Sequence, residues 1–274
     1  MKFLDLNYAS PIRRSAGKRY LRLILSFIPD RYVPKFIPIY GKLMSLIYTG
    51  DRVICPCCNG HFRNFMSITK AQWDQVCPKC LSFGRNRLMS LYLKNRTNIF
   101  SNKLKVLHIA PEYSLYKTLR SSSNLEYISA DLDSSLAMVK MDITSIQFED
   151  NTFDVVLCSH VLEHVLDDQK AMRELFRVLK PGGWAILQSP LDPSRDKTFE
   201  DFNVVSPDDR EKAFGQSDHV RIYGRDYKDR LEAAGFTVKI DDYVTGLGID
   251  TVKKYGLHEY EDIYFCTKEE QKVV

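Results

Sequence analysis

The cysteines of this sequence are spaced like metal ligands. Cys55 and Cys58 form one CxxC pair, and Cys77 and Cys80 form a second pair after 18 intervening residues. Two such turns can present four thiolates to one tetrahedral ion, so the spacing predicts a four-cysteine Zn²⁺ site. Because four protein ligands leave no open position, we expect this zinc to be structural. Cys57 is an additional cysteine that could replace one of the four.

The elements that would position other reactive groups begin near residue 103. From there short apolar runs alternate with helical stretches, which predicts a doubly wound α/β domain with a parallel sheet. The expected strands are 105–110, 125–130, a short segment before 142, 153–158, 184–188, 236–240 and 262–266. The expected helices are 113–120, 167–179 and 227–234, and a long polar connection covers 191–222. Such sheets bind ligands beyond the carboxyl ends of their strands, where the strand order reverses.

An acidic residue stands where a bound nucleoside would need one. Asp131 follows the second expected strand, 21 residues after Ala110 at the end of the first. At about this spacing an acid commonly accepts hydrogen bonds from ribose hydroxyls in doubly wound sheets. Aspartate often ends a strand, however, so this spacing needs support from a longer motif.

That longer motif lies between Lys140 and Pro190. It includes FDVVLCSHVLEHV and ELFRVLKPGGWAILQSP, and it resembles the class I S-adenosylmethionine-dependent methyltransferases of the type 11 branch. The resemblance covers roughly residues 105–190. It implies a seven-stranded Rossmann-like methyltransferase sheet, which here would follow a small N-terminal zinc module and a helical arm.

The resemblance implies a cofactor role for individual residues. Asp131 would bind the ribose hydroxyls of S-adenosylmethionine, and Asp142 with Ile143 would lie at the adenine. Ser159 and His160 would lie at the methionine end of the cofactor. The whole expected cofactor set is His108, Ala110, Glu112, Asp131, Asp142, Ile143, Ser159 and His160.

The first loop of the α/β domain departs from this family. The family usually has a glycine-rich loop that lets the backbone approach the cofactor, but the segment from His108 to Glu112 has no glycine. His108 stands where the family has an acid. Ala110 is small and Pro111 fixes the turn, so we expect the loop still to hold the cofactor. The alternative is a degenerate binding module that has lost its activity.

Methyl transfer from a sulfonium is an in-line displacement that needs positioning, and a base where the acceptor must lose a proton. The candidate catalytic residues are His160, His219 and the neighbouring Asp218. His160 could instead cap or pack against a helix, and residues 216–223 could be a hydrogen-bonded loop packed on the sheet. His164 is expected to be structural.

Charge divides the chain into a basic head and a mildly acidic body. Residues 1–52 carry ten Lys and Arg against three Asp, a net charge of +7, which leaves −3 for the rest of a chain whose total is +4. We therefore expect a basic amphipathic arm at 1–50, a zinc module with a trailing basic helix at 52–100 and the methyltransferase domain at 103–274. The arm either lies on a membrane surface or packs on the catalytic domain. Prolines at 29, 34 and 38 are expected to break the chain before a helix at about 39–48.

The function expected from the sequence is methyl transfer to an oxygen or nitrogen of a small-molecule, lipid or glycan acceptor. A nucleic-acid methyltransferase that grips RNA or DNA with its zinc module ranks second, because the body is acidic and lacks an aromatic and basic reading surface. Paired CxxC motifs and the absence of a recognisable signal peptide predict a cytoplasmic protein, with peripheral membrane contact through the arm.

Overall fold

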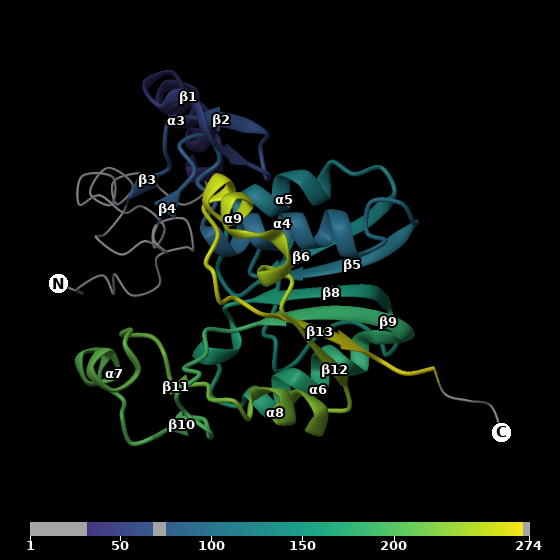
Figure 1. Ribbon diagram of the computed structural model, residues 1–274. Helices are drawn as coiled ribbons and strands as arrows, with labels where there is room; N and C mark the ends of the chain where they lie inside the picture. The colour runs from purple at the N-terminus through teal and green to yellow at the C-terminus, as the bar shows by residue number, and fades with distance from the viewer. Residues whose placement is uncertain (1–31, 68–74, 271–274) are drawn as a thin grey trace.

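A seven-stranded sheet lies at the centre of the computed structural model, which describes residues 32–67 and 75–270 (Figure 1). Its strands are β5 (Leu104–Ile109), β6 (Leu125–Asp131), β7 (Val139–Lys140), β8 (Phe153–Ser159), β9 (Leu179–Gln188), β12 (Thr237–Asp241) and β13 (Ile263–Thr267). Their order is β12-β13-β9-β8-β5-β6-β7. Neighbours from β9 to β7 are parallel, whereas β13 runs antiparallel to both β9 and β12.

The strand order reverses between β5 and β8, because β5 pairs with β6 on one side and with β8 on the other. A reversal of this kind opens a crevice at the carboxyl ends of the two strands. The predicted doubly wound sheet is therefore confirmed. β9 begins earlier than predicted, since Leu179 already pairs with Phe153 across an irregular stretch before Trp184 pairs with Val155.

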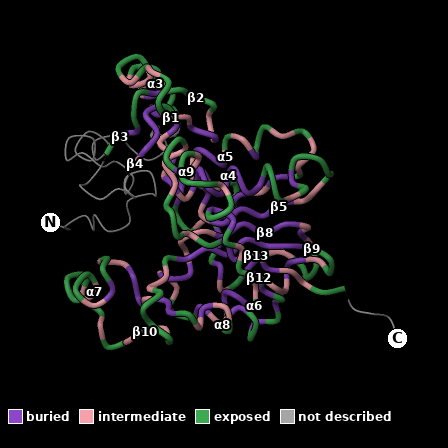
Figure 2. Tube along the Cα trace, viewed as in Figure 1, coloured by how far each residue is buried: buried purple, intermediate pink, exposed green. Residues whose placement is uncertain are grey.

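Helices cover both faces of the sheet (Figure 1). One face packs against α4 (Gly84–Arg96), α5 (Tyr113–Arg120) and α9 (Ile249–Tyr255). The other packs against α6 (Asp168–Val178) and α8 (Tyr227–Ala233). Figure 2 shows the central strands as largely buried, while α7 (Pro207–Phe214) is largely exposed. The core therefore consists of two apolar layers, one on each face of the sheet. Their packing holds the carboxyl ends of the strands in place.

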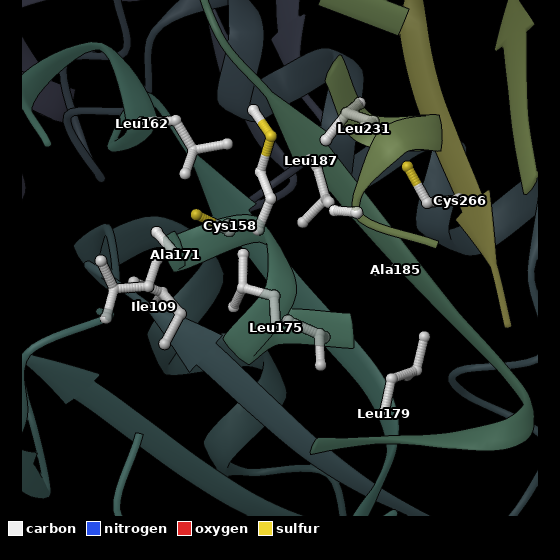
Figure 3. Packing of buried hydrophobic residues seen from close by; sticks show 14 of the residues in the cluster. Ile109, Cys158, Leu162, Ala171, Leu175, Leu179, Ala185, Leu187, Leu231 and Cys266 are labelled. Carbon is white, nitrogen blue, oxygen red and sulfur yellow. The ribbon is translucent and has the colours of Figure 1, made fainter. Parts of the chain in front are cut away.

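Helix α6 follows from its sequence. The Asp167 carboxylate caps it by accepting a hydrogen bond of 2.9 Å from the Lys170 amide. The apolar side chains at 171, 172, 175 and 178 recur at helical spacing and are all buried. Figure 3 shows Ala171 and Leu175 in the cluster that also contains Ile109. Replacing Leu175 by alanine would therefore cost about 2–5 kcal/mol of stability.

The connection after β9 contains structure that the sequence did not predict. β10 (Phe199–Glu200) pairs with β11 (Arg221–Ile222), and α7 lies between them. Helix α9 was not predicted either. Both regions are rich in polar residues, so their periodic pattern is weak.

The N-terminal part contains two small hairpins, β1 (Thr49–Cys55) with β2 (Gly60–Phe62) and β3 (Met66–Ser67) with β4 (Gln75–Val76). Helix α3 (Val33–Ile47) precedes them. The prediction that Pro38 breaks the chain is wrong, because Pro38 lies inside α3, where it removes one amide donor. The predicted helix within residues 1–31 lies outside the described residues.

Arg87 joins this part to the α/β domain. Its guanidinium is buried and donates to the carbonyls of Ser82 (2.6 Å), Tyr255 (2.7 Å) and Gly256 (2.6 Å). Gly256 has a φ of +59°, and a Cβ there would lie 2.6 Å from the Phe65 ring, so only glycine fits. Arg87 therefore faces buried carbonyls, although it belongs to the basic helix that follows the cysteines.

Candidate active site and cysteine cluster

The structure brings together the four cysteines predicted to bind zinc. The Sγ atoms of Cys55 and Cys80 are 3.6 Å apart, those of Cys58 and Cys77 are 3.7 Å apart, and all four lie within 4.8 Å of one another. A tetrahedral ion with Zn–S bonds of about 2.3 Å places its sulfurs about 3.8 Å apart. The Cys57 thiol instead donates to the Asn86 carbonyl at 3.4 Å, outside this cluster. The four-sulfur arrangement thus fits one Zn²⁺ without Cys57.

The first loop at the carboxyl edge has an unusual backbone. Ala110 has a φ of +48°, and its amide donates to the Ala130 carbonyl at 2.9 Å. This is the left-handed region that glycine normally occupies and that costs another residue about 1–2 kcal/mol. Alanine therefore takes the turn that the missing glycine would take, with strain stored beside a crevice.

His108 lies beneath this edge rather than on it. The residue is 1% exposed, and its Nδ1 is 2.8 Å from the Tyr127 hydroxyl. Its Nε2 faces Glu112 Oε2 at 3.7 Å. His108 is therefore buried in this structure, and its contact with the cofactor stays a prediction. The imidazole ring packs against the Tyr127 ring and faces the Glu112 carboxylate.

Three polar atoms near the first loop lack hydrogen-bond partners. They are Arg85 Nε, Glu112 Oε2 and Ser114 Oγ, all buried, and they are the full set of this kind in the described part of the chain. Arg85 Nε and Glu112 Oε1 are 3.9 Å apart, and Glu112 Oε1 also accepts from Asn86 at 2.8 Å. Buried polar atoms normally have partners, so their clustering indicates a ligand. A molecule with both an ammonium and a carboxylate group would satisfy them.

The two predicted nucleoside acids lie at the same edge. The carboxylate of Asp131, at the end of β6, accepts from the amides of Asp133 and Ser134 at 2.8 Å. The Met141 amide donates to the Asp131 carbonyl at 3.0 Å, which places the exposed Asp142 beside the end of β6. Ile143 is 6% exposed and packs in the core. Its side chain therefore belongs to the apolar core, and its contact with the adenine stays a prediction.

His160 follows β8 at the reversal of strand order. Its φ is +56°, and its amide donates to the Gln188 carbonyl at 2.8 Å, beyond the pairing of Ser159 with Gln188. Its Nδ1 lies 3.5 Å from Glu163 Oε1, while Glu163 Oε2 accepts from the Ser189 hydroxyl at 2.6 Å. Burial lowers the pKa of His160 well below its ordinary value and raises the pKa of Glu163.

His164 and His219 complete a cluster around Glu163. His164 Nε2 is 3.9 Å from Glu163 Oε1, and its Nδ1 is 3.1 Å from the Asp218 carbonyl. The rings of His164 and His219 meet edge to face with centroids 4.7 Å apart. His164, expected to be structural, therefore shares one site with the three predicted catalytic residues.

Arg221 holds the two segments of this cluster together. It is 1% exposed, and its guanidinium donates to the carbonyls of Leu162 and Leu166 and to Glu200, each at 2.9 Å. The Val220 amide donates to the Glu163 carbonyl at 2.9 Å. The segment after α7 is thereby fastened to the 3₁₀ turn Leu162–His164, which fixes His219 beside Glu163.

Comparison with known proteins identifies the domain. The family described as "Methyltransferase domain" matches residues 101–187. A "Ubiquinone/menaquinone biosynthesis C-methyltransferase" from Idiomarina loihiensis is 26% identical over 210 residues, 65% of this chain and 82% of that protein. The protein is an S-adenosylmethionine-dependent methyltransferase.

Further relatives of this methyltransferase are more distant or cover less of it. A "Demethylmenaquinone methyltransferase" from Renibacterium salmoninarum is 29% identical over 154 residues, 49% of this chain and 62% of that protein. The solved structure of the "[4+2]-Cyclase SpnF" has 15% sequence identity and a TM-score of 0.49, and it covers 89% of this chain and 98% of that one.

The matched segment of this methyltransferase holds Asp131, His160 and Glu163, but Arg85 precedes it and His219 follows it. Sequence reasoning missed Arg85 as a site residue because nothing in its neighbourhood marks it as more than part of a basic helix. It also missed Glu163, although the spacing of His160 and Glu163 predicts that they share one side of a helical turn.

Proposed function

We propose that this methyltransferase binds the methionine end of S-adenosylmethionine between Arg85, Glu112 and Ser114. The supporting observation is that each contributes a buried polar atom without a partner. An arginine pairs with the carboxylate of the amino acid, and a glutamate pairs with its ammonium group. When bound, the cofactor supplies a methyl group carried on a sulfonium.

Asp131 and Asp142 are proposed to face the adenosine end. Asp131 ends the strand next to β5, the usual place of an acid that accepts from ribose hydroxyls. Asp142 is exposed beside it and has an oxygen that accepts from the amide and hydroxyl of Thr144 at 2.8 Å. These contacts hold both carboxylates at the edge without burying them.

His160 is proposed as the base that takes a proton from the acceptor. It lies at the switch point, and the buried Glu163 faces its Nδ1, where a carboxylate orients an imidazole and stabilises the imidazolium. His219 and Asp218 would line the acceptor side from the segment that Arg221 fastens in place. The left-handed backbone of His160 is consistent with a functional constraint at this position.

The proposed acceptor is a quinone-type ring methylated on carbon, following the names of the relatives. This replaces the oxygen or nitrogen of a small-molecule, lipid or glycan acceptor expected from the sequence. A ring hydroxyl that loses its proton places negative charge on neighbouring ring carbons, so a base beside the ring serves carbon methylation. Transfer of label from S-adenosylmethionine to a soluble naphthohydroquinone, and not to a methyl glycoside, is the expected result; the opposite preference would refute this acceptor.

Cofactor binding is best tested by isothermal titration calorimetry with S-adenosylmethionine. Glu112→Gln and Asp131→Asn should each weaken binding by at least about tenfold, because each removes a charge-assisted hydrogen bond. Glu126→Gln is the matched control, since Glu126 is an exposed acid on β6 paired with Lys105 at 2.8 Å. The proposed site is wrong if both variants bind like the unchanged protein.

The cysteine cluster is proposed to hold a structural Zn²⁺. Arg87 is buried and unavailable to phosphate, and the nucleic-acid alternative stays a prediction. Within residues 32–67 and 75–270 no helix has the length and apolar character needed to span a bilayer. Membrane contact through residues 1–50 and a cytoplasmic location stay predictions.

A further inference from the structure

The side chains around Glu163 form a second group with metal-ligand chemistry. One ligand atom each from Glu163, His164 and His219 lies within 4.8 Å of the others. This group is separate from the cysteine cluster and offers one oxygen and two nitrogens instead of four sulfurs. Two imidazoles and one carboxylate are a typical donor set for divalent first-row transition metals with open positions.

Two of the three ligand-bearing groups, Glu163 and His164, are held in orientation by neighbouring polar groups. Glu163 is 1% exposed, and the Ser189 hydroxyl holds its Oε2 at 2.6 Å, which turns Oε1 toward the histidines. The Asp218 carbonyl lies 3.1 Å from His164 Nδ1, and its carboxylate lies 3.4 Å from the same atom, which turns His164 Nε2 toward Glu163. Partners of this kind, behind the ligand atoms, are what metal-binding imidazoles and carboxylates ordinarily have.

The distance between the facing atoms suits a shared ion better than a hydrogen bond. Glu163 Oε1 and His164 Nε2 are 3.9 Å apart, beyond hydrogen-bond range. Two ligands of one ion, with bonds of about 2.0–2.2 Å, lie about 3–3.5 Å apart. A small side-chain rotation would close the difference.

A cation would also compensate a buried charge. In the described part of the chain, no lysine or arginine nitrogen lies within 4.0 Å of the Glu163 carboxylate, whose ion-pair partners are histidines. A buried carboxylate requires compensation by a cation or by hydrogen bonds. The Ser189 hydroxyl supplies one bond, and an ion at Oε1 would supply the rest.

We propose that Glu163, His164 and His219 bind a divalent transition-metal cation whose open positions take an oxygen of the methyl acceptor. The cation would hold an acceptor hydroxyl through its oxygen and polarise it. The cation site follows from the side chains alone, whereas its role toward the acceptor rests on the proposed function.

Electron paramagnetic resonance of free Mn²⁺ tests the site in the full, zinc-loaded chain. Mn²⁺ prefers oxygen and nitrogen ligands, so the cysteine cluster does not compete for it. The unchanged protein should remove one equivalent of the free Mn²⁺ signal. Glu163→Gln and His219→Ala should each weaken binding by at least about tenfold. His258→Ala, which removes an exposed imidazole, is the control and should bind like the unchanged protein.

Two further measurements keep the outcomes distinct. Ser189→Ala removes no ligand but releases Glu163 Oε2, so it should weaken Mn²⁺ binding even if the ligand variants fail to fold. The site is overturned if the unchanged protein binds neither Mn²⁺ nor Co²⁺, or if the ligand variants bind Mn²⁺ normally. Calorimetry with S-adenosylmethionine separates the two proposals. Cofactor binding without Mn²⁺ binding overturns the metal site alone. Mn²⁺ binding without cofactor binding supports the metal site and overturns the cofactor site.

Discussion

Two single residues carry conformational or electrostatic strain at the carboxyl edge. Ala110 adopts a left-handed backbone with φ +48°, and Glu261 is a partly buried acid whose pKa is raised from 4.5 to about 7. Both conditions cost stability in the folded state, and both occur in segments near the proposed cofactor. Such strain is testable one residue at a time.

At Ala110, glycine should stabilise the fold. Ala110→Gly removes the Cβ that disfavours this backbone, and we expect the free energy of unfolding to rise by about 1 kcal/mol. Ala233→Gly, at an exposed position in α8, should lower it instead. Denaturant unfolding measures both. A loss of stability in Ala110→Gly would contradict the strain assigned to this turn.

At Glu261, stability should depend on pH. Burial raises the pKa of Glu261 to about 7, opposed by Arg85 and Arg87. The folded state therefore binds a proton more tightly than the unfolded state, and stability falls as pH rises from about 4.5 to 7, by at most about 3 kcal/mol. Glu261→Gln should raise the melting temperature more at pH 8 than at pH 5. An equal effect at both values would show that the carboxyl titrates normally.

At the scale of elements, the active site depends on how β11 is fastened to the turn Leu162–His164. Arg221 has no exposed side chain and is surrounded by carbonyls and by Glu200 and Asp168. Tyr223 and Arg230 complete this buried network by donating to Asp168 at 2.7 Å and 2.8 Å. The segment carrying His219 is thus positioned by polar contacts in addition to the packing of Tyr223 in the core.

Arg221→Met should destabilise the protein by about 3–5 kcal/mol, because it removes one of the two arginines that pair with Asp168 and Glu200 and leaves the Leu162 and Leu166 carbonyls without that donor. Methyl transfer should fall while the affinity for S-adenosylmethionine stays near its original value, since Arg221 fastens the segment that is proposed to line the acceptor. Arg225→Ala is the control, because Arg225 pairs with Asp196 on the surface and should change stability by less than about 0.5 kcal/mol. Equal effects of the two variants would argue against the positioning role of Arg221.

At the scale of the whole molecule, the cysteine cluster and the α/β domain are mechanically joined. Arg87 links Ser82, which follows Cys80, to the end of α9, and its neighbour Arg85 reaches the first loop. The cluster therefore sets the position of the first turn of α4. If Arg85 binds the cofactor as proposed, the N-terminal module contributes to cofactor binding although it precedes the matched methyltransferase segment.

Loss of zinc should consequently weaken cofactor binding. Cys77→Ser should reduce bound zinc from one equivalent to near zero and lower the affinity for S-adenosylmethionine by about tenfold or more, because α4 loses its anchor. Cys57→Ser is the matched control and should retain zinc and affinity. Metal analysis and calorimetry measure the two quantities. Unchanged affinity in a zinc-free variant would mean that Arg85 is held by the α/β domain alone.

Local pattern was sufficient for the central sheet and for the cysteine cluster, but it did not predict β10, α7, β11 or α9. The helix predicted at 113–120 has those bounds as Tyr113–Arg120, and the four cysteines meet as their spacing predicted. Apolar periodicity and short ligand spacings are properties of neighbouring residues, so they can be read without a fold. The prediction that Pro38 breaks the chain was wrong, since helix α3 tolerates the loss of one hydrogen bond.

The surroundings of individual side chains were decided by the tertiary structure. His164 meets Asp218 across 54 positions of the chain, and Arg87 meets Tyr255 across 168. Whether a histidine is a base or a ligand, and whether an arginine faces solvent or carbonyls, depends on groups supplied by such distant segments. The burial and the electrostatic environment of a side chain depend on all of its neighbours in space. Those neighbours come from distant parts of the chain, so they are known only once the sheet has brought them together.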